Sequence, residues 1–285
     1  MIPLEKKHLD RIRELVHSYS GIILERVATR NVDKKIHHQM KHFGVEKPAD
    51  YILILEKFEH NSKVMDELIA ELTVSESYFF RNPVQFEYIL EVLLPEFYQR
   101  SNWQIPLRVW SAGCSRGEEA YSLAMTLQHF QNKHPAARFT INAGDINAKN
   151  LAAAREAVYG KRSLREKLAV FEEKFGFEIG KRDEKGECAV SDEIKSLVDL
   201  QKLNLKNIRG LNCLAGSDII FCRNVLIYFD EQLRKQLAEK FYQCLNPGGV
   251  VFLGESECYS GVSVPFELVN YKKVYAYKKP MESHK

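Results

Sequence analysis

The sequence lacks the features of several specialised protein classes. Its six cysteines, at positions 114, 188, 213, 222, 244 and 258, form no CxxC pair and no cluster with histidine at zinc-ligand spacing. No apolar run approaches the length that spans a membrane, and the charged start MIPLEKKHLDRIREL has neither a signal-peptide core nor a transit-peptide pattern. We therefore expect a cytoplasmic protein with reduced thiols, no metal site and no membrane insertion.

A strong net charge, internal repeats and low-complexity segments are also absent. The formal charge is +3 and the pI is about 8.4, far from the positive field of a dedicated duplex-binding protein. The 285 residues are 45% hydrophobic, which is enough apolar material for one large or two smaller cores. We expect one or two globular domains, no nucleic-acid partner, and any electrostatic partner to be recognised by a local patch.

The first 70 residues have the pattern of short amphipathic helices. Leu9, Ile12 and Leu15 keep helical spacing, as do the apolar residues of segment 64–72. Gly44 is expected to end one helix, and Pro48 is expected to begin the next. We predict a small helical domain over 1–70.

The pattern changes near residue 107. Short apolar segments ending in Gly, Ser, Asp or Asn alternate with helical stretches, which predicts a doubly wound parallel sheet; the segments are LRVWSAGCS, RFTINAGDI, SDIIFCRNV and GVVFLGESE. The charged stretch near 160–200 is too long for an ordinary connection, so we predict an inserted subdomain with a turn around residues 183–186. The ending FELVNYKKVYAYKKP alternates like one final strand.

The first of these strands leads into a glycine-containing turn and a helix. Gly113 and Gly117 allow backbone to approach a ligand at the carboxyl edge of the sheet, although the GxGxxG spacing is missing and a plain tight turn is the alternative. Asp145, at the tip of the next strand, is placed to bind ribose hydroxyls. Together they favour a nucleoside-containing ligand.

Two glutamates open the helix after Gly117. They oppose a pyrophosphate and suit a ligand with an amine or sulfonium group. A glutamate in a first helical turn is also ordinary matching of the helix dipole. We assign that role to Glu119 and the functional role to Glu118.

Four motifs in order resemble the CheR family of chemotaxis receptor methyltransferases. They are LTVSESYFFRNP at 72–83, RVWSAGCSRGEEAYSLAM at 108–125, GDINAKNLAAAREAVYG at 144–160 and IIFCRNVLIYFD at 219–230. The resemblance implies an α/β fold: a Rossmann-like class I methyltransferase sheet with an inserted small β-subdomain, preceded by a small all-α N-terminal domain. After the helical domain, the resemblance implies a linker and helix at 71–106 that close the cofactor site. The methyltransferase domain then covers 107–285, with its insert at about 163–200.

The resemblance implies S-adenosylmethionine as cofactor and S-adenosylhomocysteine as product. Ser75, Ser77 and Arg81 of the linker would close over the cofactor, although family members often carry Asn and Thr where this chain has Ser75 and Ser77. The family's other cofactor positions fall on Glu118, Asp145, Asn204, Leu205, Arg223 and Asn224, with Gly113 added from the glycine turn. Asn204, placed from the short match KLNL, has a turn residue as its alternative.

The implied reaction is esterification of receptor glutamates. A glutamate has a reference pKa of about 4.3 and is already ionised, so direct displacement needs alignment rather than a strong base or a metal. The resemblance places Tyr228 at the acceptor carboxylate, with a buried core aromatic as the alternative. Arg100 is a looser match to an arginine that is thought to assist the reaction in the family. The alternative is that Arg100 is a solvated surface arginine.

A basic face in the N-terminal region fits the cytoplasmic helical domain of methyl-accepting chemotaxis receptors, which is acidic. Its members are Arg26, Arg30, Lys34, Lys35, His38, Lys41 and His42. Such a face would steer association and weaken with salt, although solvated helix faces are common. Relatives also bind a receptor's C-terminal peptide through the insert, which is a second possible partner here.

Three other functions compete with receptor methylation. A non-catalytic S-adenosylmethionine-binding signalling module would use the same binding residues. A nicotinamide-dependent oxidoreductase would share the fold and Asp145, but the glutamate pair after Gly117 opposes its pyrophosphate. A nucleic-acid methyltransferase would need an NPPY-like run to grip a flipped base, and CRNV stands in that place.

Overall fold

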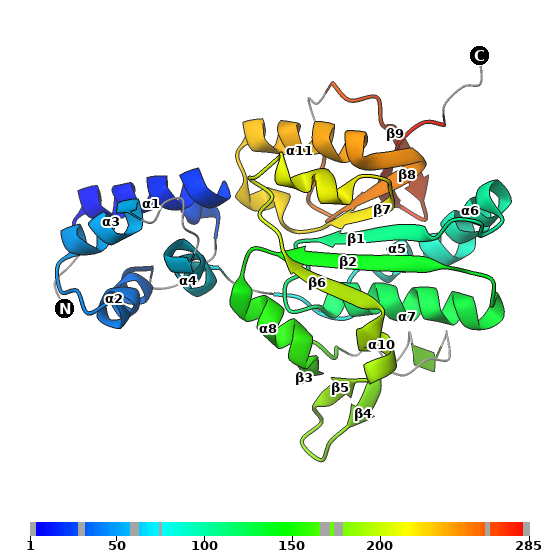
Figure 1. Cartoon of the computed structure of the whole chain (residues 1–285), viewed down its shortest axis with the longest axis horizontal. Helices are drawn as coiled ribbons and strands as arrows, with labels where there is room; N and C mark the ends of the chain where they lie inside the picture. The colour runs from blue at the N-terminus through cyan, green and yellow to red at the C-terminus, as the bar shows by residue number, and fades with distance from the viewer. Residues whose placement is uncertain are drawn as a thin grey trace.

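The computed structural model describes residues 4–27, 32–57, 63–73, 76–165, 172–173, 179–259 and 263–281. The chain begins with four helices that lie together beside the sheet (Figure 1), namely α1 (Lys6–Ser20), α2 (Val32–His42), α3 (Pro48–Lys57) and α4 (Lys63–Leu72). A short 3₁₀ turn, η1 (Leu24–Arg26), follows α1. The predicted helical N-terminal region is confirmed.

These helices form because each buries one apolar face. Ile12, Leu15 and Val16 of α1 are buried, as are the apolar residues of α4 at helical spacing. Helix α1 ends at Gly21, whose φ of 73° is left-handed and therefore suits glycine. Pro48 opens α3, where its missing N–H costs no helical hydrogen bond.

A seven-stranded sheet lies at the centre of the rest of the described chain, in the order β6-β2-β1-β7-β8-β10-β9. The first five strands in this order pair in parallel and the last two are antiparallel. The strands are β1 (Leu107–Ala112), β2 (Phe139–Asp145), β6 (Val198–Lys202), β7 (Ser217–Cys222), β8 (Leu245–Leu253), β9 (Glu267–Tyr271) and β10 (Val274–Lys278). The strand order reverses beside β1, as in doubly wound sheets, so the predicted fold class is confirmed.

Helices cover both faces of the sheet, and alternate strand residues divide between the two faces. On β1, Val109 packs with α7 (Glu118–Lys133) and with the run α5 (Pro83–Tyr88), η2 (Ile89–Leu93) and α6 (Leu94–Ser101). Its neighbour Trp110 faces η3 (Gly210–Leu214) and α11 (Glu231–Cys244). Helix α8 (Ala148–Glu156) packs beside β6 and β2 and touches α4.

The insert between α8 and β6 carries a small antiparallel sheet in the order β3-β5-β4. Its strands are β3 (Val158–Tyr159), β4 (Gly180–Arg182) and β5 (Cys188–Val190), and α10 (Asp192–Ser196) leads back to β6. The predicted turn at 183–186 is confirmed, because the Gly186 N–H donates to the Asp183 carbonyl. The sheet begins at Val158, a few residues before the predicted insert.

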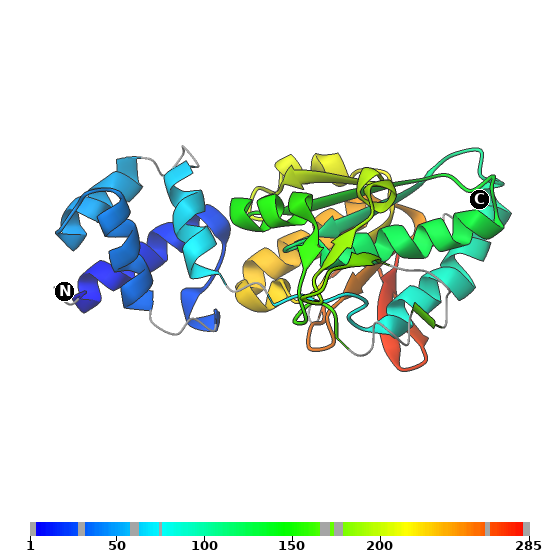
Figure 2. The ribbon, with the colours of Figure 1, turned by 90° about the horizontal axis from the view of Figure 1, so that it is seen from below.

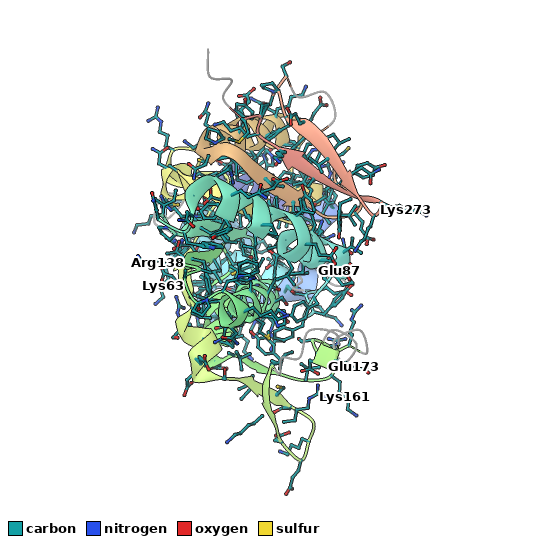
Figure 3. The ribbon with its side chains drawn as sticks, turned by 90° about the vertical axis from the view of Figure 1, so that its right-hand side faces the viewer. Lys63, Glu87, Arg138, Lys161, Glu173 and Lys273 are labelled. Atoms are coloured by element: carbon teal, nitrogen blue, oxygen red, sulfur yellow. The ribbon has the colours of Figure 1, made fainter. Side chains whose placement is uncertain are left out.

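Two local predictions were wrong. The final apolar stretch is a hairpin of β9 and β10, because Lys272 and Lys273 both have positive φ and turn the chain back on itself. Lys273 lies at the tip of this hairpin (Figure 3). Strand β8 begins at Leu245, directly after α11, so it starts earlier than the segment GVVFLGESE from which the strand was predicted.

The N-terminal helices face the edge of the sheet at which the parallel strands end (Figure 2), and Thr73 and Asp145 line one cavity there. Among the described residues, no helix is both long and apolar enough to cross a membrane.

Candidate functional site

A cavity of about 290 Å³ lies where the carboxyl ends of the parallel strands meet the N-terminal helices and the linker. Loops after β1, β2, β6 and β7 all contribute to it, as expected where the strand order of an open sheet reverses. The lining residues are Ser20, Ile22, Thr73, Glu76, Ser77, Tyr78, Arg81, Phe86, Gly113, Cys114, Ser115, Glu119, Asp145, Ile146, Asn150, Leu203, Asn204, Leu205, Arg223, Asn224, Val225, Ile227, Tyr228 and Phe229.

The turn after β1 brings backbone to the cavity. Gly113 has a φ of 97°, and a Cβ at this position would lie 2.5 Å from the Val225 side chain. Only glycine therefore allows β1 to pass so close to the loop after β7. The Ser115 hydroxyl, buried at this turn, has no hydrogen-bond partner among the described residues.

Asp145 is held rigidly at the end of β2. Its carboxylate accepts hydrogen bonds from the N–H groups of Ser115 and Asn147, each at 2.8 Å. Burial raises the pKa of Asp145, while these two N–H donors oppose the rise. Oδ1 also accepts a 3.5 Å hydrogen bond from the Asn150 side-chain amide, so Oδ2, which accepts only from Ser115 among the described residues, keeps a lone pair for a ligand.

The second glutamate of the pair, Glu119, lines the cavity. Its carboxylate accepts a 2.6 Å hydrogen bond from the Ser111 hydroxyl and lies 3.6 Å from the Arg223 guanidinium. Burial raises the pKa of Glu119, and Arg223 and the Ser111 hydroxyl oppose that rise. Glu118 instead turns away from the cavity and accepts a 2.8 Å hydrogen bond from the Ser163 hydroxyl. The structure thus places Glu119, rather than Glu118, in the lining of the cavity.

Arg223 is a buried cation in the cavity wall. Its side chain is 1% exposed, and it donates one hydrogen bond to the backbone carbonyl of Arg81 in the linker. Its guanidinium also stacks near the rings of Phe86 and Phe221. Burial lowers the pKa of Arg223, and Glu119 opposes this. Its Nη1 atom faces Glu119, and its Nε atom is buried without a hydrogen-bond partner among the described residues.

Tyr228 lies on the short turn η4 (Leu226–Tyr228), after the Arg223–Asn224 pair. It is half-buried and lines the cavity, and burial raises the pKa of its phenol. The hydroxyl therefore stays protonated near neutrality and can donate a hydrogen bond. Asn224, with a left-handed φ of 58°, reverses the chain between β7 and this turn.

The structure brings most of the predicted site residues together. Those that line the cavity are Ser77, Arg81, Gly113, Asp145, Asn204, Leu205, Arg223, Asn224 and Tyr228. Ser75 lies outside the described residues. Glu118 is buried nearby against Ser163 and is not part of the lining.

Arg100 lies elsewhere, and its expected contact with substrate is not supported. Its guanidinium donates to the carbonyl of Pro247, near the start of β8. The cavity lies at the opposite edge, where the parallel strands end. Arg100 is an exposed arginine that ties α6 to the far side of the sheet.

Sequence reasoning missed the N-terminal contribution to the cavity. Ser20 and Ile22 line it from the end of α1, and Asn204 donates a 2.9 Å hydrogen bond to the Tyr19 carbonyl beside them. Gly21 marks only a helix end in the sequence, and no local pattern connects it to a ligand. The described residues contain no group of His, Cys, Asp and Glu that could hold a metal ion.

The cavity is suited to a ligand that carries both signs of charge. Glu119 and Asp145 supply carboxylates, while Arg81 and Arg223 supply guanidinium groups. No glycine-rich phosphate cradle accompanies them, and Glu119 at the start of α7 disfavours a phosphate there. A zwitterionic nucleoside ligand fits this set of groups.

Comparison with known proteins gives a consistent result. The model of a family described as CheR methyltransferase, SAM binding domain, matches residues 75–275. The chain is 33% identical over 270 residues to chemotaxis protein methyltransferase 2 of Vibrio cholerae, covering 95% of this chain and 92% of that protein. It is 31% identical to the chemotaxis protein methyltransferase of Escherichia coli, covering 98% and 93%. The chemotaxis protein methyltransferase of Borreliella burgdorferi is also 31% identical, with 91% of each chain covered.

Proposed function

Because the chain belongs to the CheR family of S-adenosylmethionine-dependent methyltransferases, whose relatives act in chemotaxis, we propose that it methylates glutamate side chains of bacterial chemotaxis receptors. The products are glutamyl methyl esters, formed during sensory adaptation. The observation that carries the proposal is the cavity at the sheet edge, where cofactor-binding groups and the Tyr228 hydroxyl meet.

The residues present fit S-adenosylmethionine. Asp145 is suited to the ribose hydroxyls, and Glu119 offers a buried carboxylate to a positive group. Arg223 has one buried nitrogen atom, Nε, that lacks a partner among the described residues and suits a carboxylate, and Arg81 adds a second cation from the linker. When bound, the cofactor supplies a methyl group on a positively charged sulfur.

The chain's own residues align the reaction. Bound S-adenosylmethionine would supply its methyl group to a carboxylate oxygen of the acceptor and would leave as S-adenosylhomocysteine, so the ester and this product would account for every atom. The acceptor glutamate is ionised near neutrality, since its reference pKa is about 4.3, and no base has to remove a proton. Tyr228 donates a hydrogen bond that orients the carboxylate, and the linker residues Ser77 and Arg81 exclude water.

We place the receptor contact on the exposed lysines of α2. Lys34 and Lys41 are exposed, Lys35 is partly exposed, and the three form no ion pair within the described part of the chain. An acidic receptor helix would be attracted to them. The second proposed contact, a receptor C-terminal peptide, would use the edges of the small β3-β5-β4 sheet.

The test is methyl transfer to receptors. We would mix the purified protein with radiolabelled S-adenosylmethionine and receptor-containing membranes of the same organism, then treat the receptor band with mild base. Label released as methanol identifies a carboxyl methyl ester, and Asp145→Ala should abolish it. Asp199→Ala, which removes an exposed carboxylate from β6, is the matched control and should retain transfer.

Two other results would change the conclusion. Cofactor binding without transfer would favour a non-catalytic signalling module. Absence of cofactor binding by the unmodified protein would refute the assignment of the cavity.

A further inference from the structure

The end of α1 and the turn after it lie directly against the segment that carries Tyr228. The Ile23 N–H donates a 2.9 Å hydrogen bond to the Tyr228 carbonyl, and Ile22 forms an antiparallel bridge with Phe229. The Arg26 guanidinium donates to the Phe229 carbonyl. We call residues 17–26 the latch, because three consecutive residues, 228–230, are each bonded to it.

The third bond of the latch reaches the next helix. His17 Nε2 lies 2.8 Å from Asp230 Oδ2, and the other carboxylate oxygen of Asp230 accepts the Leu233 N–H at 2.7 Å. Asp230 is thus the N-cap of α11 and a partner of the latch at once. The segment with Tyr228 is held between a rigid helix and the N-terminal region.

The latch also packs closely against α11. Gly21 has a φ of 73°, and a Cβ there would lie 2.3 Å from the Leu233 side chain. The left-handed φ favours glycine, and the missing Cβ leaves room for the Leu233 side chain to pack against this turn. Ser20 and Ile22, on either side of Gly21, line the same cavity as Tyr228.

Arg26 therefore differs from the other cations of the predicted basic face. Lys34, Lys35 and Lys41 lie on α2 and form no ion pair within the described part of the chain. Arg26 lies on η1, and its guanidinium is engaged with the Phe229 carbonyl. Its bond fixes backbone next to Tyr228, so a docking role does not explain its geometry.

We propose that the latch, through Arg26 and Ile23, positions Tyr228 for methyl transfer, so that the N-terminal helical region is a working part of the active site. The catalytic part of this inference depends on the proposed function. Arg26 is a positioning residue, because it acts through the backbone of residues 228–229 and does not contact the reacting groups.

The structural test does not require catalysis. Hydrogen–deuterium exchange of the full chain, followed by mass spectrometry, reports on the peptides that span residues 21–27 and 225–231. Arg26→Ala should raise exchange in both peptides together. Arg11→Ala is the matched control, because Arg11 pairs with Glu14 and Glu56, outside the latch, and not with segment 228–230. Unchanged exchange in Arg26→Ala, or an equal change in both variants, would overturn the latch.

The kinetic test separates positioning from docking. Arg26→Ala should lower kcat about 10-fold, since small misplacements of an aligning group are costly, with little change in KM for receptor. Arg26→Lys, which keeps a donor, should recover part of that loss. A raised KM with unchanged kcat would make Arg26 a docking residue and overturn the proposal. If the unmodified protein methylated no receptor glutamate, the proposed function would fail, while the exchange experiment would still decide whether the latch exists.

Discussion

At the scale of single residues, one carboxylate outside the cavity organises the turn that carries Tyr228. Glu257 accepts hydrogen bonds from three backbone N–H groups, those of Asn224 at 2.7 Å, Gly254 at 2.8 Å and Ile227 at 3.2 Å. Hydrogen bonds to an ionised acceptor are stronger than neutral ones. Glu257 therefore joins the loop after β7 to the loop after β8 and fixes the approach to Tyr228.

We predict that Glu257→Gln slows methyl transfer through Tyr228. Glutamine has one oxygen acceptor, and its amide N–H₂ cannot accept a hydrogen bond from the backbone, so at least one of the three bonds is lost. The loss should cost about 1–2 kcal/mol of stability and lower kcat about 10-fold. Glu255→Gln, at an exposed neighbour on the same loop, is the control.

A double-mutant cycle with Tyr228→Phe makes this prediction specific. If Glu257 acts by positioning Tyr228, the double variant should lose less kcat than the product of the two single losses. Multiplicative losses, or a fall in kcat for Glu255→Gln as well, would show that Glu257 acts only on overall stability.

Residues at strand ends were the part of the site that the sequence could predict. Asp145 is the last residue of an apolar strand, Arg223 directly follows another, and parallel strands end at one edge of a sheet. The choice between Glu118 and Glu119 depends on a rotation of 100° about the axis of α7, which local pattern does not specify. Ile22 could not be found, because its place in the cavity arises from packing between distant segments.

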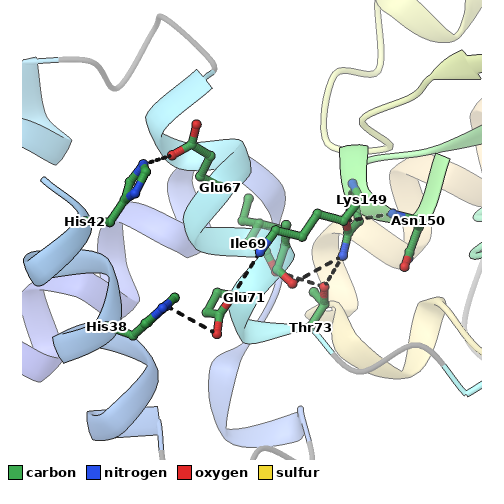
Figure 4. A network of polar contacts seen from close by, with 10 residues as sticks. His38, His42, Glu67, Ile69, Glu71, Thr73, Lys149 and Asn150 are labelled. Atoms are coloured by element: carbon green, nitrogen blue, oxygen red, sulfur yellow. Dashed lines mark hydrogen bonds and ion pairs between the residues drawn. The ribbon is translucent and has the colours of Figure 1, made fainter. Parts of the chain in front are cut away.

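At the scale of elements, helix α2 divides its charged residues between two surfaces. Figure 4 shows His38 and His42 pointing from α2 toward α4, where they lie 3.8 Å from Glu71 and 3.4 Å from Glu67. Glu71 also pairs with Lys149 of α8 at 3.1 Å. The histidines therefore face the carboxylates of α4, whereas Lys34, Lys35 and Lys41 form no ion pair within the described part of the chain.

We predict that Lys41→Glu weakens receptor association and leaves the chemistry intact. A reversed charge on the docking face should raise KM for receptor about 10-fold at low ionic strength, and salt should reduce the difference. The control is Lys47→Glu, which makes the same change of charge at an exposed position between α2 and α3. Equal effects of the two variants would argue against a docking surface on α2.

The elements that sequence patterns missed are those in which the backbone, and not side-chain periodicity, sets the structure. Apolar alternation continues from β9 into β10, so one strand was expected where the chain turns at Lys272–Lys273. Lysine is rare in a left-handed turn, and the usual Asn-Gly or Asp-Gly signal is absent. The parallel strands were predicted because each combines an apolar run with a following turn.

At the scale of the whole molecule, the helical region and the sheet share one hydrophobic cluster. Leu15 of α1 and Leu68 of α4 belong to the same buried cluster as Leu205 and Leu233. A polar contact reinforces it, since Asp66 of α4 pairs with Lys202 at the end of β6 and accepts a 2.8 Å hydrogen bond from the Tyr19 hydroxyl. The N-terminal helices should therefore not unfold independently of the sheet.

This continuity predicts one calorimetric unfolding transition, with equal calorimetric and van't Hoff enthalpies. Because Ser20, Thr73 and Asp145 line one cavity, S-adenosylmethionine should stabilise the molecule as a unit. At 100 times its Kd, the cofactor adds about 2.7 kcal/mol and raises the temperature of that single transition. Asp145→Ala should remove the shift and keep the single transition. Two transitions, with only one moved by the cofactor, would show that the helical region folds as a separate unit and that Ser20 contributes nothing to cofactor binding.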